Sequence, residues 1–169
     1  MRPPVAAALV LSIVAQGCQY NPHAHLYTTR KPECGDVVGR YRLTELHASR
    51  RDGVWGLAAL DGRSCVVELR ADGTFAATNV PPSELGLSGS EALDRLIDDS
   101  GAWSIGEVTS VDGGGGRAQA VWGLRLRSSP DAQPRMLPPR FTGQKPPHGL
   151  IFTLGDPDAG EAMILTREG

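Results

Sequence analysis

The chain has 169 residues, of which 40% are hydrophobic and 21% are charged, and its formal net charge is −2. This length supports one domain with a single core and does not comfortably support two. A nearly neutral charge without a basic stripe gives no support for a nucleic-acid surface, so we expect no nucleic-acid partner.

The first eighteen residues are typical of an export signal. A positive start at Arg2 is followed by an apolar run over residues 5–14 and by Ala-Gln-Gly immediately before Cys18. The apolar run is too short to span a bilayer as a helix. An ordinary signal peptidase could cut before Cys18. The same stretch also resembles a bacterial lipobox, in which the cysteine is acylated and becomes the new N-terminus.

The lipobox resemblance implies an exported protein held at a membrane by a palmitate-type lipid anchor on Cys18. It divides the chain into a signal peptide (1–17), a lipid-anchored tether (18–33) and one folded domain (34–169) in the cell envelope. Gln19 follows the lipidated cysteine. In Gram-negative sorting this residue resembles an outer-membrane signal, facing the periplasm or the surface, rather than an inner-membrane retention signal.

The chain has three cysteines, so in an exported protein one of them has no disulfide partner within the chain. If Cys18 carries lipid, Cys34 and Cys65 form a natural disulfide pair in an oxidising compartment. A bridge that closes a loop of this length adds about 3–4 kcal/mol of stability in the chain-entropy model. The alternative is that Cys65 is a buried free thiol.

The first half of the domain predicts an antiparallel meander of four strands. Apolar and polar residues alternate near residues 38–46, and a second run follows at 54–60. The segment Cys65–Asn79 then contains two strand-like runs joined at Asp72-Gly73, which is a strong hairpin signal.

The second half begins with a stop and a helix. Two prolines at 81–82 end the strand, and leucines at helical spacing predict a short amphipathic helix over Ser90–Asp98 with Ser90 as its N-cap. Strands are expected near residues 101–108 and 118–127. A proline-rich stretch (128–147) follows, in which Arg-Phe-Thr at 140–142 adds a short edge segment, and a hairpin closes the chain.

These elements resemble a group of small bacterial exported proteins and lipoproteins with a lipocalin-like, or calycin-like, barrel. The matching motifs are Gly-Arg-Tyr-Arg-Leu (39–43), Leu-Arg-Ala-Asp-Gly-Thr-Phe (69–75), Gly-Ala-Trp (101–103) and Gly-Asp-Pro-Asp-Ala-Gly-Glu (155–161). The resemblance implies a mainly β fold, an antiparallel up-and-down sheet or barrel of about eight strands with one short helix in the middle. Such a barrel has an interior that side chains fill or that holds one small ligand. The aromatic candidates for lining a ligand pocket, or for filling it as core, are Trp55, Phe75, Trp103 and Trp122.

No catalytic pattern accompanies this architecture. The sequence lacks a Gly-x-Ser-x-Gly motif, and His47 and His148 have no legible partner, so we predict no enzymatic activity, no catalytic residue and no cofactor. The Asp-Pro-Asp-Ala-Gly run at 156–160 fits turn chemistry better than a calcium loop, and no metal site is predicted. Two functions remain: a barrel that binds a small apolar ligand, or a structural or assembly accessory protein that acts through contacts with an envelope protein.

Overall fold

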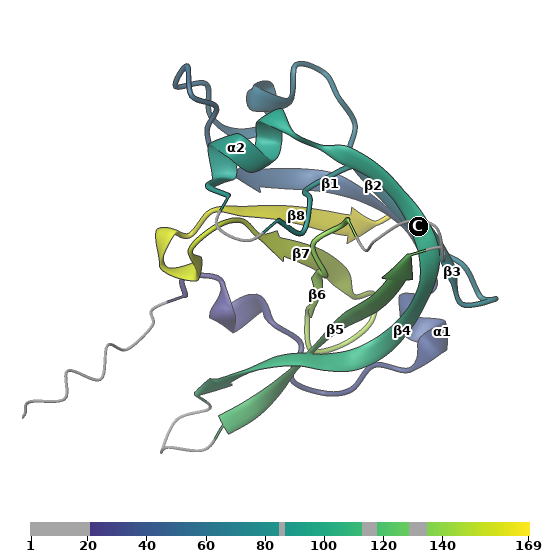
Figure 1. Cartoon of the computed structure of the whole chain (residues 1–169). Coiled ribbons are helices and arrows are strands. Elements are labelled where there is room, and N and C mark those ends of the chain that lie inside the picture. Colours follow the sequence, from purple (N-terminus) through teal and green to yellow (C-terminus); the bar gives the residue numbers. More distant parts are fainter. Residues whose placement is uncertain (1–20, 85–86, 113–117, 129–134) are drawn as a thin grey trace, which may run out of the picture.

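The computed structural model describes residues 21–84, 87–112, 118–128 and 135–169. Its antiparallel strands form one closed barrel in which each strand pairs with the next along the chain and β8 pairs with β1 (Figure 1). The strands are β1 (Gly39–His47), β2 (Val66–Leu69), β3 (Thr74–Val80), β4 (Ile97–Asp112), β5 (Ala118–Ser128), β6 (Arg140–Thr142), β7 (Gly149–Thr153) and β8 (Ala162–Arg167). The prediction of a mainly β, up-and-down, lipocalin-like barrel is confirmed.

The β2–β3 hairpin turns at Asp72-Gly73, as the sequence predicts. Gly73 has a φ of 82°, a left-handed conformation that suits glycine. The Asp72 carboxylate accepts hydrogen bonds from the Thr74 backbone N–H at 2.8 Å and from its hydroxyl at 2.7 Å. On each strand the buried side chains alternate with less buried ones, so Leu69 and Phe75 face the interior from paired positions.

Two segments differ from the sequence-based strand assignment. Residues 54–60 are not a strand, because Gly56 has a φ of 65° and the chain from there winds into a 3-10 helix, η2 (Gly56–Leu60). Its last residues, Ala59 and Leu60, are buried against the barrel, so the apolar pattern reflects one face of a helical turn. The short segment Arg140–Thr142 takes the place of the sixth strand, β6, between β5 and β7.

The central helix exists but lies nearer the N-terminus than expected. Helix α2 spans Gly89–Asp94, and its N-cap is Ser88 rather than Ser90. Ser88 and Glu91 form a capping box, in which each side chain accepts a hydrogen bond from the other residue's backbone N–H. The helix ends early because β4 already begins at Ile97.

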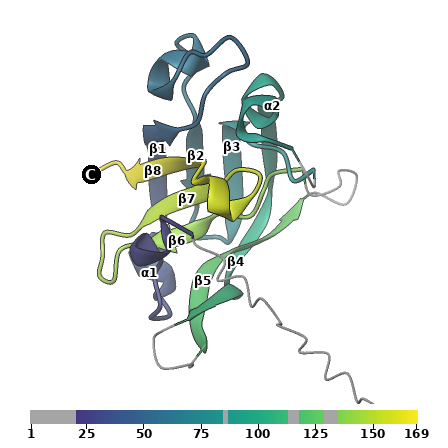
Figure 2. The same cartoon turned by 90° about the vertical axis from the view of Figure 1, so that its left-hand side faces the viewer.

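The two ends of the barrel carry different elements, as Figure 2 shows. At one end, here called the α2 end, lie α2 and the loop 48–64. At the other, the α1 end, lie α1 (Cys34–Val37) and the turn of the β2–β3 hairpin. Between them the inward-facing side chains form one continuous core. Its largest fully buried members on the strands are Tyr41, Leu69, Phe75, Leu124, Phe141, Leu150 and Phe152.

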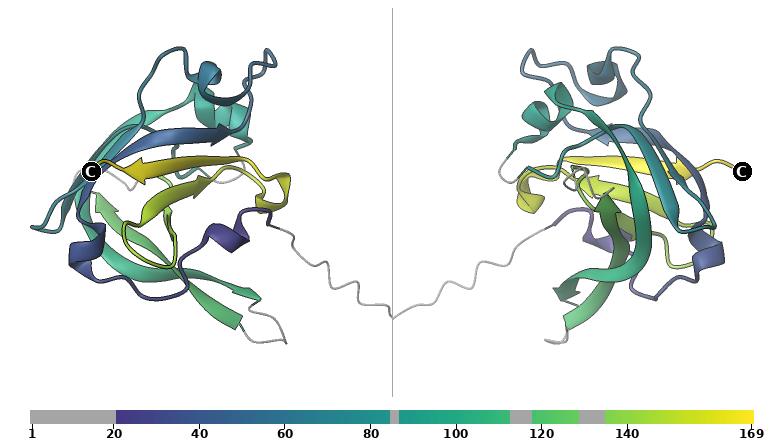
Figure 3. Two further views of the ribbon diagram at one scale, coloured as in Figure 1. Left: turned by 180° about the vertical axis from the view of Figure 1, so that it is seen from behind. Right: turned by 45° about the vertical axis from the view of Figure 1, so that its right-hand side comes forward.

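Residues 21–33, predicted as a tether, are part of the folded domain, and we call them the strap. The strap enters the wall of the barrel between β5 and β6: Thr28 donates its backbone N–H to Phe141 O at 2.9 Å and accepts from Trp122 N at 3.1 Å. It contains a short 3-10 helix, η1 (Ala24–Leu26), and continues to α1 (Figure 3). The folded part therefore extends back to residue 21 instead of beginning at residue 34.

The strap also buries an apolar cluster on the outer face of the barrel. Ile151 of β7 faces this cluster, whereas its neighbours Leu150 and Phe152 face the interior core. Only 2% of Tyr27 is exposed. The buried members of this outer cluster are Tyr27, Val121, Ile151, Ala162 and Ile164. An outer face that is apolar needs a cover, and the strap supplies it.

Over the residues that the structure describes, no helix is long and apolar enough to cross a membrane. The last 3-10 helix, η3 (Pro157–Ala159), forms the turn between β7 and β8. Its N-cap Asp156 accepts a hydrogen bond from the Asp158 backbone N–H at 3.0 Å, which is the turn chemistry predicted for this aspartate-rich run.

Candidate functional site

The four aromatic residues proposed for a pocket occupy three different environments. Phe75 is 1% exposed and belongs to the filled core. Trp103 is 8% exposed and lies at the edge of that core, while Trp122 is partly buried against it. Trp55 is 65% exposed, so its assignment to the interior is wrong. The four residues thus do not form one site.

A mainly apolar pocket of about 610 Å³ lies at the α1 end, and Trp103 is one of its walls. Three parts of the chain converge on it: the strap with α1, the turn of the β2–β3 hairpin, and the middle of β4. We call it the α1-end pocket. Its lining residues are Lys31, Pro32, Glu33, Cys34, Val38, Ala71, Gly73, Trp103, Ser104 and Ile105.

Hydrogen bonds to the hairpin hold Trp103 in place. Its indole N–H donates to Arg70 O at 3.1 Å, and its backbone N–H donates to Gly73 O at 2.8 Å. Because both N–H groups of this residue are satisfied, the ring presents apolar surface to the pocket. The pocket wall formed by Trp103 and Ile105 is therefore fixed by β4 and by the hairpin that was evident in the sequence.

The rim of the α1-end pocket carries the polar groups. Lys31 and Glu33 come from the strap, and the ammonium of Lys31 lies 5.5 Å from the centre of the Trp122 ring, within the range of a cation–π contact. An apolar wall with a few polar groups at its edge is typical of small-molecule sites. The strap residues were missed in the sequence because a segment without periodicity gave no sign that it packs on the barrel.

Trp55 belongs instead to an exposed apolar patch on the loop 48–64 at the α2 end. Val54 is 37% exposed and Leu57 is 50% exposed. Together with Trp55 they are the large exposed hydrophobic side chains among the described residues. We call these three residues the Trp55 patch. The three residues lie on a loop at the barrel end, outside the lining of the α1-end pocket.

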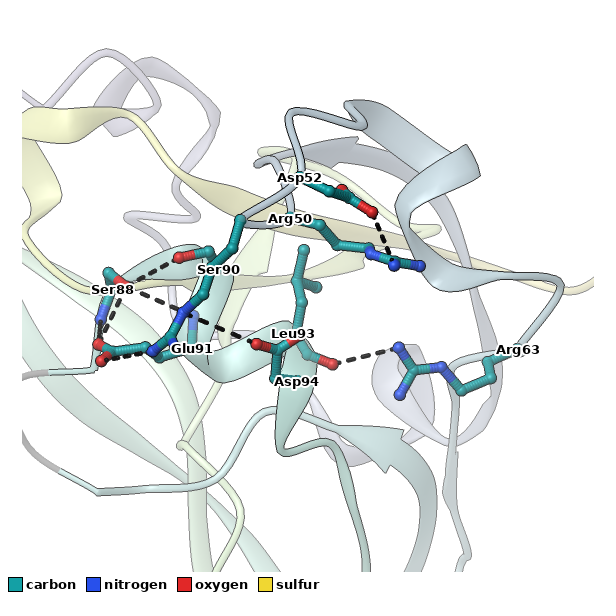
Figure 4. A network of polar contacts seen from close by, with 9 residues as sticks. Arg50, Asp52, Arg63, Ser88, Ser90, Glu91, Leu93 and Asp94 are labelled. Atoms are coloured by element: carbon teal, nitrogen blue, oxygen red, sulfur yellow. Dashed lines mark hydrogen bonds and ion pairs between the residues drawn. The ribbon is translucent and has the colours of Figure 1, made fainter.

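Polar contacts tie the loop that carries the Trp55 patch to α2 (Figure 4). Arg63 donates to the Leu93 backbone carbonyl at 3.2 Å, whereas the pair of Arg50 and Asp52 at 2.8 Å lies within the loop itself. Arg51 reaches Glu91 at 3.2 Å. Each exposed ion pair stabilises little, but together they anchor both limbs of the loop and give the patch a defined position.

The structure contains no bridge between Cys34 and Cys65. Both are free cysteines, Cys34 exposed on α1 and Cys65 buried just before β2. Gly39, five residues beyond Cys34, pairs with Leu69, so Cys34 lies near one end of β2 and Cys65 near the other. Cys65 and Leu69 are four residue steps apart, which is about 13 Å along an extended strand. A disulfide requires Cα atoms within about 7 Å. The barrel therefore holds Cys34 and Cys65 too far apart for the predicted disulfide.

The signal peptide and Cys18 lie outside the described residues, and lipidation at Cys18 stays a prediction. Comparison of the chain with protein-family models, with curated proteins and with solved structures found no match. The assignment of function therefore rests on the barrel and its surfaces.

Proposed function

We propose that this protein is an exported, lipid-anchored binding protein without catalytic activity, and that its α1-end pocket holds a small apolar ligand. The observation that carries the proposal is the pocket of about 610 Å³ between the strap, the hairpin and Trp103. The interior core is occupied by large side chains, so the ligand sits at the end of the barrel rather than in its centre.

Filling the pocket should abolish ligand binding without altering the core. Ala71 is exposed and lines the pocket, so Ala71→Trp introduces bulk there and removes no core side chain. We expect the variant to bind the neutral probe N-phenyl-1-naphthylamine at least about tenfold more weakly than the wild type, measured by fluorescence titration.

The matched control is Ala58→Trp, which adds the same side chain at an exposed position of η2 at the opposite end. This control should bind the probe like the wild type. Equal binding by Ala71→Trp and the wild type, or no binding by the wild type, would contradict the pocket assignment. Native mass spectrometry of protein taken from its exported location then identifies the natural ligand by the mass lost on denaturation.

The anchoring part of the proposal rests on the N-terminal sequence. Wild-type cells supplied with labelled palmitate should incorporate it into the protein, and Cys18→Ser should remove the label, since the thiol is the acceptor. Label retained in the variant would refute the anchor at this residue. With Gln19 after the anchor, we place the protein in the outer membrane where the source has one.

A second candidate function is that of an accessory protein of the cell envelope, and the Trp55 patch favours it. Exposed aromatic and aliphatic side chains on an ordered loop are typical of protein contact sites. If the protein carries no bound ligand and does not bind the apolar probe, the accessory function of the Trp55 patch is the better assignment.

A further inference from the structure

A second pocket lies on the wall of the barrel, where β5 and β6 separate. Among the described residues these two strands pair at Gly123 and Arg140, and the Leu124 N–H donates to Pro139 O at 3.0 Å just before β6. Beyond that point the chain before β6 turns away from β5: Leu137 donates its N–H to Pro81 O at 2.9 Å, across the α2 end. A hollow of about 760 Å³ lies between the part of β5 near Arg125 and the end of β7. We call this hollow the seam groove.

Three arginines line the seam groove from its two sides. Arg125 and Arg127 are two residues apart on β5 and share one face of the sheet. Arg140 reaches the groove from β6, across the seam. Within the described part of the chain, none of the three pairs with a carboxylate, and Glu107 is the acidic side chain among the lining residues. The groove thus keeps an excess of positive charge.

Arg140 is held in place by the strap and by β7. Its guanidinium lies 5.2 Å from the centre of the Tyr27 ring, and its Nη1 donates to Thr153 Oγ1 at 3.0 Å. The Tyr27 hydroxyl in turn lies 3.2 Å from the same Thr153 oxygen. The guanidinium is therefore positioned before any ligand arrives, which lowers the entropy lost on binding.

One donor of Arg140 has no acceptor. Its Nε is buried and makes no hydrogen bond to any described residue. Buried polar groups are nearly always paired in folded proteins, so an unpaired one signals a missing partner. A guanidinium binds carboxylate or phosphate oxygens through charge-assisted N–H donors, and because the Nε of Arg140 is enclosed by protein atoms, a ligand in the groove meets the terminal nitrogens of this guanidinium.

Apolar surface adjoins these charges. Val108 is partly buried on β4, and Leu137 and Pro138 border the groove on the side opposite β5. A ligand that fits such a groove combines an anionic group with an apolar portion, because each part then meets its complement.

We propose that the seam groove binds an amphiphile whose carboxylate or phosphate headgroup sits on Arg125 and Arg140, with its apolar portion against Leu137 and Pro138. The groove adjoins the α1-end pocket at Ser104, but its other lining residues differ and it takes a charged rather than a neutral ligand, so the proposal is tested independently of the function proposed above.

Isothermal titration calorimetry tests the proposal on the full exported chain carrying Cys18→Ser and purified without detergent. The probes are dodecanoate, dodecyl phosphate, dodecanol and inorganic phosphate. We expect binding of dodecanoate or dodecyl phosphate, and binding at least about tenfold weaker for dodecanol and for inorganic phosphate. The tighter of the two amphiphiles identifies the headgroup.

Variants locate the binding. Arg140→Gln and Arg125→Gln should each weaken amphiphile binding, the former by at least about tenfold. Arg125 is exposed, so its replacement tests the charge with the fold intact. The matched control is Arg95→Gln, which removes an exposed arginine paired with Glu84 near α2 and should change the affinity less than about twofold.

Four results would overturn the proposal. They are an absence of binding by both amphiphiles, equal affinity for dodecanol, equal affinity for inorganic phosphate, and an affinity that the two groove variants leave unchanged. If the amphiphile instead loses affinity in Ala71→Trp but not in Arg140→Gln, it occupies the α1-end pocket. That result contradicts the seam groove while supporting the neighbouring site.

Discussion

Replacing Tyr27 with alanine is expected to lower the free energy of unfolding by about 3–5 kcal/mol, the range for removing a large buried aromatic side chain. Tyr27 is 2% exposed at the centre of the outer cluster. Its hydroxyl accepts a hydrogen bond from Asn21 at 2.7 Å, and its ring lies beneath the Arg140 guanidinium. The loss should appear in urea unfolding followed by tryptophan fluorescence, as a lower transition midpoint.

Two further variants separate packing from hydrogen bonding. Tyr27→Phe keeps the ring and should lose about 1 kcal/mol, the net worth of the hydroxyl contacts. Leu57→Ala removes a side chain that is 50% exposed and should change stability by about 0.5 kcal/mol or less. If Tyr27→Ala unfolds at the wild-type midpoint, the strap does not stabilise the barrel and acts as the tether that the sequence predicts.

Alkaline pH is expected to destabilise the barrel through two buried groups. Burial raises the pKa of Tyr41 from 10.0 to about 12, although the nearby Arg167 charge pulls it back in part. Burial likewise raises the pKa of the Cys65 thiol from 9.0 to about 12. Below about pH 9 both groups keep their protons in the folded and unfolded states, so their stabilising contribution is fully present.

Between about pH 9 and 12 the unfolded chain releases these protons while the folded chain retains them. The unfolded state then binds fewer protons, so stability falls as pH rises. With about 1.4 kcal/mol for each pKa unit, the free energy of unfolding should be lower by about 3 kcal/mol at pH 10.5 than at pH 8. Urea unfolding at these two pH values measures the difference.

The double variant Tyr41→Phe with Cys65→Ala should lose most of this pH dependence, because neither replacement ionises. Tyr41→Phe also gives up the hydrogen bond to the Val37 carbonyl, so its stability at pH 8 is lower by about 1 kcal/mol. Cys34→Ala changes an exposed cysteine and should keep the wild-type slope. A double variant as steep as the wild type would show that other groups govern the alkaline transition.

The candidate site could be predicted from the sequence only where it depends on strands. Trp103 was identified because it alternates with its neighbours on a strand, and it lines the α1-end pocket. The other wall residues Lys31 and Pro32 come from the strap, whose irregular contacts with the barrel produce no periodic pattern in the sequence. Trp55 was misplaced for the converse reason: an apolar run of strand length is also compatible with a 3-10 turn, and Gly56 decided the matter.

The sequence by itself determined the β2–β3 hairpin and a mainly β, antiparallel fold, because turn residues and alternation act between near neighbours in the chain, whereas the closure of the sheet into a barrel was decided by the tertiary structure. Only the tertiary structure decided that the strap pairs with β5 and β6, that Cys34 and Cys65 lie apart, and that Arg125 and Arg140 line one groove. Those arrangements depend on which distant segments pack together once the barrel closes, and no spacing along the chain encodes such contacts.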